Sequence, residues 1–230
     1  MKTTTFVLLA ATAGFQTQLG FGAQAETAKR LELAATVVQE IMGSKEQSIP
    51  EDLLDDAHCA VIVPGLKKGA FIVSARYGKG FITCRNAGDR GWSAPAAIRV
   101  EGGGVGFQIG GSETDLILLV MNDRGAKRLM SSQFTIGGEG EVAAGPVGRS
   151  ASAQTDAKFT AEILSWSRSR GVFAGVAVQG ATLREDQDDN KELYGKKLTT
   201  QQVISGKTAV PASARPLLRA LTAHSPAEDK

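Results

Sequence analysis

The sequence is poor in the side chains on which most enzymes and metal sites rely. It contains two histidines and two cysteines among 230 residues, and aromatic residues make up 6% of it. His58 is a sequence neighbour of Cys59, and adjacent side chains on a strand point to opposite faces, so these two do not form a nucleophile and its base. The segment G-x-S-x-G does not occur. We therefore expect a protein that is not an enzyme, with no catalytic residue, metal site or cofactor.

A large excess of charge of one sign is also missing. Lysine and arginine number 26 and aspartate and glutamate 24, which gives a formal net charge of +2. Binding to nucleic acid depends on many lysine and arginine contacts to phosphate, so we expect no nucleic-acid partner. The segment Gly138-Glu-Gly-Glu-Val-Ala143 matches a dinucleotide pattern, but Ala144-Gly145-Pro146 follows where that site needs a helix, which argues against nucleotide binding.

No apolar run reaches the length of about 20 residues that a membrane-spanning helix needs. The N-terminus has the features of a secretory signal: Lys2 is positive, residues 6–15 are apolar or small, and Ala23-Gln24-Ala25 fits a small-x-small cleavage site. We therefore expect residues 1–25 to be a signal peptide, cleaved before Glu26. The mature chain, with a net charge of +1, is then periplasmic or secreted and peripherally associated with a membrane. An uncleaved anchor and a buried first helix are the alternatives.

Cys59 and Cys84 are the only cysteines, and export places them in an oxidising compartment, where disulfides persist. They lie at the start and end of two neighbouring predicted strands, so a disulfide is geometrically reasonable. Two separate buried thiols are the alternative, because free cysteine also behaves as a small apolar residue.

Glycine, in contrast, is abundant, and 27 glycines without a three-residue period indicate tight turns and closely packed strands. The spacing of Ala28, Leu31 and Val38 predicts an amphipathic helix over 26–43. Further helices are expected at 50–57, 123–132 and 212–221. Strands are expected at 60–63, 70–76, 80–85, 94–100, 104–110, 115–121, 134–136, 141–144, 163–167 and 172–183, with turns at Pro64-Gly65 and Tyr77–Gly80.

These elements predict one α+β domain over residues 26–205, followed at 206–230 by a C-terminal extension with a short helix and a frayed tail. Its glycine-rich antiparallel strands form a curved sheet or a partly closed barrel, covered by the N-terminal amphipathic helix and one or two others. Trp92 and Trp166 are interpreted as core residues, with anchoring at a membrane surface as the alternative.

Six motifs rich in glycine and aromatic residues follow one another between residues 31 and 205. They are Gly69-Ala-Phe-Ile-Val-Ser-Ala-Arg-Tyr-Gly-Lys-Gly80, Gly91-Trp-Ser-Ala-Pro95, Gly102-Gly-Gly-Val-Gly-Phe-Gln-Ile-Gly110 with Thr114-Asp115, Ala143-Ala-Gly-Pro-Val-Gly-Arg149, Ser165-Trp-Ser-Arg-Ser-Arg-Gly-Val-Phe-Ala-Gly175, and Asp189-Asn190 with Tyr194-Gly195. In this order they resemble the SYLF domain family. The resemblance implies a lipid-binding domain; eukaryotic members bind phosphoinositides, and some bind actin. The chain is similar to the stand-alone, exported bacterial members, so we do not expect actin as its partner.

One cluster of basic and aromatic residues is a candidate lipid-binding site: Lys67, Lys68, Phe71, Arg76, Tyr77 and Lys79. A basic residue close to an anionic surface contributes about 1 kcal/mol, so a few of them support a weak, salt-sensitive contact. Solvated turn residues without a function are the alternative. We predict non-catalytic, peripheral binding to anionic phospholipid in the cell envelope; the alternative function is an envelope scaffold that binds a protein partner, with incidental lipid contact.

The acidic stretch Asp186-Gln-Asp-Asp-Asn190 resembles the opening of a calcium loop, because carboxylates at alternate positions can converge on one cation. Lys191 and Lys197 stand where such a loop has glycine and glutamate. The stretch is therefore interpreted as a helix cap and turn, with calcium binding as the alternative.

Overall fold

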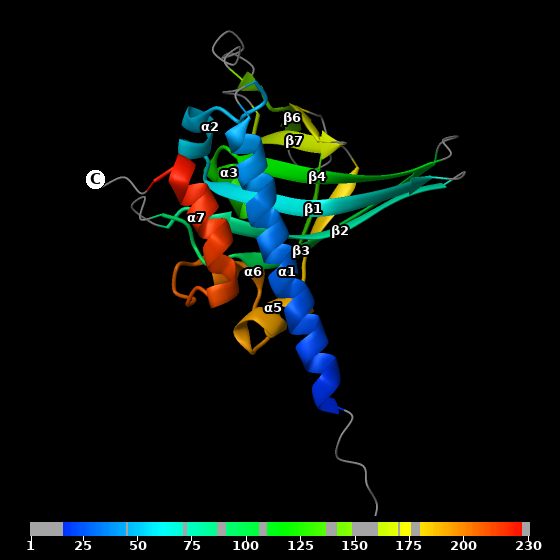
Figure 1. Ribbon diagram of the computed structural model, residues 1–230, viewed down its shortest axis with the longest axis vertical. Helices are drawn as coiled ribbons and strands as arrows, with labels where there is room; N and C mark the ends of the chain where they lie inside the picture. The colour runs from blue at the N-terminus through cyan, green and yellow to red at the C-terminus, as the bar shows by residue number, and fades with distance from the viewer. Residues whose placement is uncertain are drawn as a thin grey trace, which may run out of the picture.

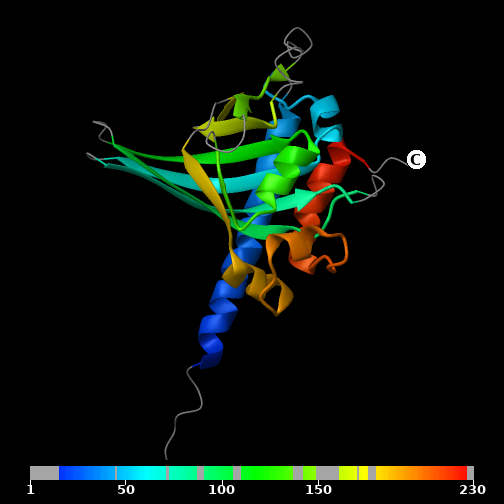
Figure 2. The same ribbon diagram turned by 180° about the vertical axis from the view of Figure 1, so that it is seen from behind.

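The computed structural model describes residues 16–44, 46–70, 73–86, 91–105, 110–136, 142–148, 161–169, 171–175 and 180–226. Within them, one mostly antiparallel sheet curls into a half-barrel, with helices packed on it (Figures 1 and 2). The α+β architecture predicted from the sequence is confirmed.

The strands follow the order β5-β9-β3-β2-β1-β4-β7-β6 across the sheet, and β8 also pairs with β7. Only the pairing of β6 with β7 is parallel among those described. The strands are β1 (Cys59–Ala70), β2 (Val73–Cys84), β3 (Ala96–Val105), β4 (Gly110–Val120), β5 (Gln133–Thr135), β6 (Val142–Ala144), β7 (Ile163–Ser169), β8 (Val172–Gly175) and β9 (Ala181–Glu185).

The helices are α1 (Gln16–Gly43), α2 (Glu51–Asp55), α3 (Asp123–Leu129), α5 (Gln187–Tyr194), α6 (Thr200–Ile204) and α7 (Arg215–His224), with a 3₁₀ turn at Ala212–Ala214. Helices α1 and α7 lie side by side on one face of the sheet (Figure 1). Residues of α1 and α7 pack there with Ile62, Phe81, Ile117 and Trp166. No helix in the described ranges has the length and apolar composition needed to cross a bilayer.

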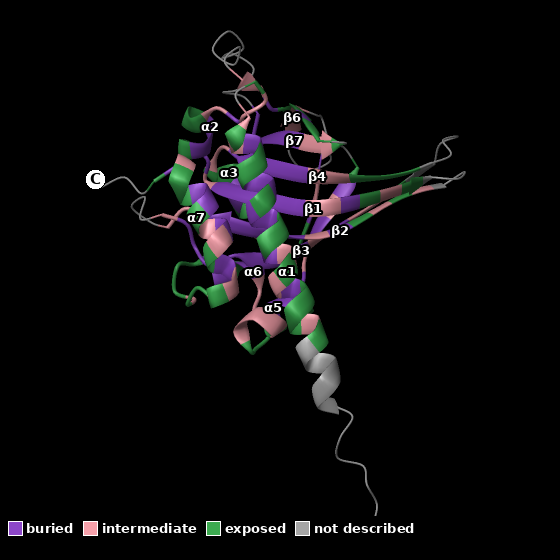
Figure 3. Ribbon diagram, viewed as in Figure 1, coloured by how far each residue is buried: buried purple, intermediate pink, exposed green. Residues whose placement is uncertain are grey.

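A second core lies on the opposite face, toward which the sheet curls (Figure 2). It contains Val61, Val63, Leu118 and Phe134, with contributions from α3 and α6. Figure 3 shows the buried centre of the sheet between these two layers. Trp92 and Trp166 are both buried, which confirms the core role predicted for them.

Around Pro64-Gly65, β1 has one residue more than the stretch of β2 or β4 that it faces. Against β4, Val63 and Leu66 keep their partners while the two residues between them oppose Asp115 alone. Gly65 has a φ of 62°, a left-handed conformation that glycine adopts without steric cost, and its N–H donates to the Asp115 carboxylate at 2.9 Å. This arrangement is a β-bulge.

The bulge explains two glycines of β2. A Cβ on Gly80 would overlap the carbonyl oxygen of Ile62 and lie 2.8 Å from the Cα of Val63, and a Cβ on Gly78 would lie 2.9 Å from the side chain of Leu66. The turns predicted at Pro64-Gly65 and Tyr77–Gly80 are therefore wrong: both segments lie inside strands. Glycine marks the close approach of β1 to β2 here, and the connection between these strands falls at 71–72, outside the described residues.

Beyond the bulge, four strands project past the helices as a ribbon that we call the wing. It comprises residues 66–70, 73–78, 101–105 and 110–114. At its far end β1 stops at Ala70, which pairs with Gly110 of β4, and β2 starts at Val73, which pairs with Val105 of β3. Figures 1 and 2 show the wing extending from the body, and Figure 3 shows that exposure increases along it.

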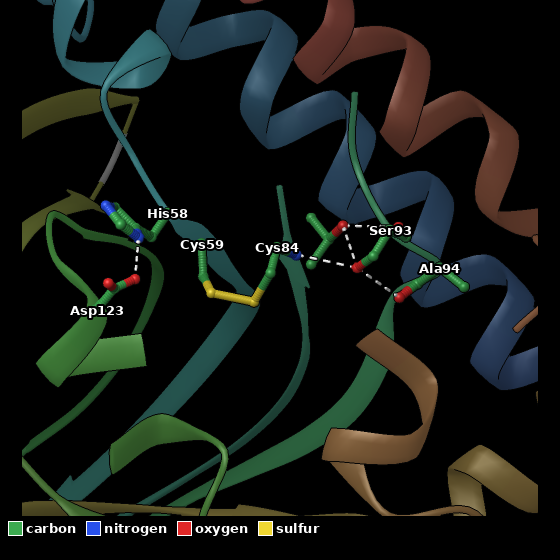
Figure 4. Close-up of a disulfide and its surroundings, with 7 residues drawn as sticks. His58, Cys59, Cys84, Ser93, Ala94 and Asp123 are labelled. Atoms are coloured by element: carbon green, nitrogen blue, oxygen red, sulfur yellow. Dashed lines mark hydrogen bonds and ion pairs between the residues drawn. A yellow bond between two sulfur atoms is a disulfide. The ribbon is translucent and has the colours of Figure 1, made fainter. Parts of the chain in front are cut away.

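At the end of the β1–β2 hairpin opposite the wing, Cys59 and Cys84 are directly paired and joined by a disulfide (Figure 4). Arg85 N–H donates to the His58 carbonyl next to this pair, so the cysteines form a non-hydrogen-bonded pair, in which opposite side chains are closest. Ser93 supports the strand end, since its Oγ accepts from the Cys84 N–H at 3.1 Å. Of the two alternatives left open by the sequence, the structure contains the disulfide.

Other differences from the predicted elements lie at glycines and caps. The predicted strand at 104–110 divides between the end of β3 and the start of β4, and that at 172–183 divides between β8 and β9. Helix α3 is capped by Asn122, whose side chain accepts from the Gly125 N–H. Helix α6 was missed, although Thr199 and Gln202 form a capping box whose spacing is visible in the sequence.

We predict that Gly80→Ala destabilises the protein, because the added methyl group is forced into the backbone of β1. The expected loss in the free energy of unfolding is about 2 kcal/mol. Gly69→Ala, also in a strand of this hairpin, is the matched control: nothing lies within 4 Å of its Cβ position, so the change should stay within about 0.5 kcal/mol. Urea unfolding monitored by circular dichroism checks both variants, and equal stability of the two would contradict the packing around the bulge.

Candidate functional site

Lys67, Lys68, Arg76 and Tyr77, which were predicted to bind lipid, lie together on the wing. Lys67 pairs with Tyr77 across β1 and β2, and Lys68 pairs with Arg76. Lys67 is exposed and Tyr77 is 49% exposed, while Lys68 and Arg76 are partly buried. Phe71, also predicted for this site, lies outside the described residues.

The two lysines point to opposite faces of the wing. Lys67 lines a groove together with Leu33 and Val37 of α1, so its side chain is on the helix-covered face. Successive residues of a strand alternate between faces, which places Lys68 on the other face. The wing therefore carries one of these lysines on each of its faces.

Lys79 is not part of this cluster, because it lies within β2 and not in a turn. Its Nζ is 2.7 Å from an Asp189 carboxylate oxygen and 3.0 Å from one of Asp186. Arg30 of α1 also donates to Asp189, at 2.6 Å. Both carboxylates are buried. Lys79 thus belongs to an ion-pair network that joins α1, β2 and α5, and we leave it out of the lipid-binding surface.

The network changes the protonation equilibria of its members. Burial alone would lower the pKa of Lys79, but the hydrogen bonds and negative charges of Asp189 and Asp186 outweigh it, and the pKa is raised. Burial would likewise raise the pKa of Asp186, but the backbone N–H of Asp189 and the ammonium of Lys79 outweigh it and lower the pKa. Both groups are thereby held in their charged forms around neutral pH.

The acidic stretch at 186–190 serves as a cap and a connection. The Asp186 carboxylate accepts from the Asp189 N–H at the start of α5, and the buried Asn190 side chain accepts from Ala97 N–H and donates to the Leu198 carbonyl. This confirms the capping role predicted for the stretch. No group of three or more His, Cys, Asp or Glu side chains suited to a metal ion occurs in the described part of the chain.

A groove of about 730 Å³ separates α1 from the wing. Its floor is fixed by Arg168 of β7, which contacts Asp115 of β4 at 2.5 Å and also pairs with Glu40 of α1. The groove is lined by Glu26, Lys29, Arg30, Leu33, Thr36, Val37, Pro64, Gly65, Lys67, Glu113, Asp115, Arg168 and Gly171. The sequence did not single out Lys29, Leu33 or Glu113 as candidates, because these residues converge only through the packing of α1 on the sheet.

Within the described residues, the fold combines a curled sheet with a projecting ribbon that carries charged side chains. The family model described as Ysc84, Las17-binding protein actin regulator, matches residues 101–224. The chain belongs to this family, the Ysc84/SYLF family, as its motifs predicted. Proteins of this family are non-catalytic binding proteins, and the family binds lipids and actin.

Relatives occur in fungi and animals. The chain is 37% identical over 204 residues to the protein YSC84 of Saccharomyces cerevisiae, covering 86% of this chain and 43% of the yeast protein. It is 39% identical over 187 residues to an SH3 domain-containing protein of Schizosaccharomyces pombe, covering 80% of this chain and 43% of that protein. The human SH3 domain-containing YSC84-like protein 1 is 32% identical over 194 residues, or 82% of this chain and 56% of the human protein. The chain thus spans about half the length of these relatives.

We predict that Lys79→Met lowers the free energy of unfolding by about 2 kcal/mol at neutral pH, because two buried carboxylates lose a cation. Since the pKa of Asp186 is lowered in the folded chain, its contribution is fully present above the ordinary pKa of an aspartate and disappears as the pH falls through the lowered pKa. The raised pKa of Lys79 makes its contribution disappear only as the pH rises through that pKa.

The difference in stability between wild type and Lys79→Met should therefore be constant around neutral pH and shrink in strong acid. Urea unfolding over a pH series measures it. Lys127→Met, at an exposed position on α3, is the matched control and should leave stability nearly unchanged. A difference that grows on acidification would contradict the ion-pair network.

Proposed function

We propose that the chain binds peripherally to membranes containing anionic lipid, through Lys67, Lys68 and Tyr77 of the wing. The observation that carries this proposal is the position of the two lysines: they lie on a ribbon that projects from the body, and neither ammonium group is ion-paired with a described residue. Each supplies about 1 kcal/mol of attraction when close to an anionic surface. The half-exposed Tyr77 adds a side chain suited to the membrane interface.

The opposite orientation of the lysines suggests how the wing meets the membrane. A flat surface laid against one face of the wing reaches Lys67 or Lys68, but not both. Both ammonium groups approach the same headgroup layer when the far end of the wing points toward the membrane. We therefore propose an end-on contact, in which the body and its helices stay in the aqueous phase.

We further propose that the chain is exported and acts in the cell envelope after cleavage before Glu26. Two features support this. The N-terminal turns of α1 project beyond the body (Figure 1), whereas Thr27 is buried and donates to Glu192 at 2.7 Å, so the expected site lies where the helix meets the fold. The Cys59–Cys84 disulfide fits an oxidising compartment.

Binding to a protein is the second candidate function. One similar yeast protein, 36% identical, is named LAS seventeen-binding protein 3, and the family includes actin-binding members in eukaryotes. For an exported chain we favour an envelope scaffold over actin as this alternative, with lipid contact incidental.

Cosedimentation with vesicles tests the lipid proposal. The protein should bind phosphatidylglycerol-containing vesicles more than pure phosphatidylcholine vesicles, and high salt should weaken the binding, because exposed charges are screened. Lys67→Glu with Lys68→Glu should lower the affinity at least roughly ten-fold, since four units of charge change at the contact. Lys127→Glu with Lys207→Glu, an equal change at exposed positions of α3 and the C-terminal segment, should have a much smaller effect.

Equal losses in the two double variants would show that overall charge, not the wing, determines binding. Equal and negligible binding of the wild type to both vesicle types would reject the lipid function and favour the scaffold.

Export is tested by mass spectrometry of the protein from the periplasmic fraction of a bacterial host that expresses the full sequence. We expect a chain that begins at Glu26 and contains the disulfide. Ala23→Phe and Ala25→Phe should each block cleavage, because both positions require small residues, whereas Gln24→Phe at the unconstrained position between them should be processed. An intact N-terminus in the wild-type protein would contradict the proposal.

A further inference from the structure

The groove between α1 and the wing contains charged groups of two kinds. Arg30 is held by Glu26 at 3.3 Å and by Asp189, and Arg168 is held by Asp115 and Glu40. These groups are already neutralised by partners within the fold. They shape the groove but are not available to a ligand.

Three other charged lining residues have no ion pair with any described residue: Lys29 on the α1 side, and Lys67 and Glu113 on the wing side. Lys67 and Glu113 are direct cross-strand partners on β1 and β4, and all three side chains are exposed. Leu33, which is 48% exposed, adds an apolar wall beside them. The groove thus offers two cations and one anion around a partly apolar space.

We infer that this groove binds a phosphoethanolamine group, with the phosphate between Lys29 and Lys67 and the primary ammonium against Glu113. A phosphodiester carries one negative charge and accepts hydrogen bonds from ammonium groups, and a primary ammonium donates them to a carboxylate. The carbon chain between these charges can lie against Leu33. A volume of about 730 Å³ is within the range of small-molecule sites.

The inference goes beyond the membrane binding proposed above, with which the groove shares only Lys67. Other headgroups fit the three charges less well. A phosphoglycerol group has no cation and leaves Glu113 unmatched, next to an added negative charge. A phosphocholine group has a cation without N–H donors, so it makes no hydrogen bond with the carboxylate.

Isothermal titration with glycerophosphoethanolamine tests this inference, with glycerophosphoglycerol and glycerophosphocholine as comparison ligands. The wild-type chain should prefer the ethanolamine ester. Glu113→Gln should lower the affinity for that ester about five-fold, as expected for loss of one charge-assisted hydrogen bond at an exposed site, and should abolish the preference over the glycerol ester. Lys29→Gln should weaken both esters, and Glu32→Gln, at an exposed position of α1 outside the groove, should change neither.

Two arms identify the source of the group. Binding to vesicles enriched in phosphatidylethanolamine that depends on Glu113 indicates a lipid headgroup, whereas Glu113-dependent binding of the soluble ester alone indicates a free metabolite. Lys68→Glu separates this site from the membrane surface, because it should weaken binding to anionic vesicles and leave ester binding intact. Absence of ester preference in the wild type, or an unchanged preference in Glu113→Gln with a normal unfolding midpoint, overturns the inference.

Discussion

The extra residue in β1 is the constraint on which both halves of the molecule depend. Before the bulge, residues 60–63 are completely buried between the two cores; after it, the same strand leaves the body and carries Lys67 and Lys68. The Asp115 carboxylate holds the bulge in place, because it accepts hydrogen bonds from both the Gly65 N–H and the Arg168 side chain. Strands bend and twist more strongly at such a residue, so one local irregularity separates the packed half-barrel from the exposed wing.

The position of α1 follows from its buried apolar stripe together with two ion pairs. Arg30 reaches Asp189 near one end, and Glu40 reaches Arg168 further along the helix. The apolar stripe buries this face of the helix, and the two ion pairs fix the helix to the fold at two separate points along its length. The width of the groove is set in this way, because α1 forms one of its walls and the wing the other.

Much of the fold was readable from the sequence because its signals are local. The amphipathic spacing that ends at Gly43 and the apolar run in β4 correspond to real elements, although α1 begins at Gln16, before the predicted start at 26. The arrangement of the site residues was harder to predict from the sequence. Counting alternate residues through Pro64-Gly65 assigns the two lysines to the wrong faces, because the bulge shifts the alternation by one. Lys79 was misplaced for a related reason: Gly78 and Gly80 resembled turn residues, while their small size in fact accommodates β1.

The disulfide and the wing stand at opposite ends of one hairpin, and this gives the hairpin the mechanics of a cantilever. The disulfide between Cys59 and Cys84 joins the two strands at the base of the hairpin. Along its length, the hairpin is hydrogen-bonded to β4 on one side and to β3 on the other. A force applied at the far end bends the exposed part of the strands, while the disulfide keeps β1 and β2 together at the base. Contact with a soft, fluctuating surface can thus deform the ribbon while the half-barrel keeps its shape.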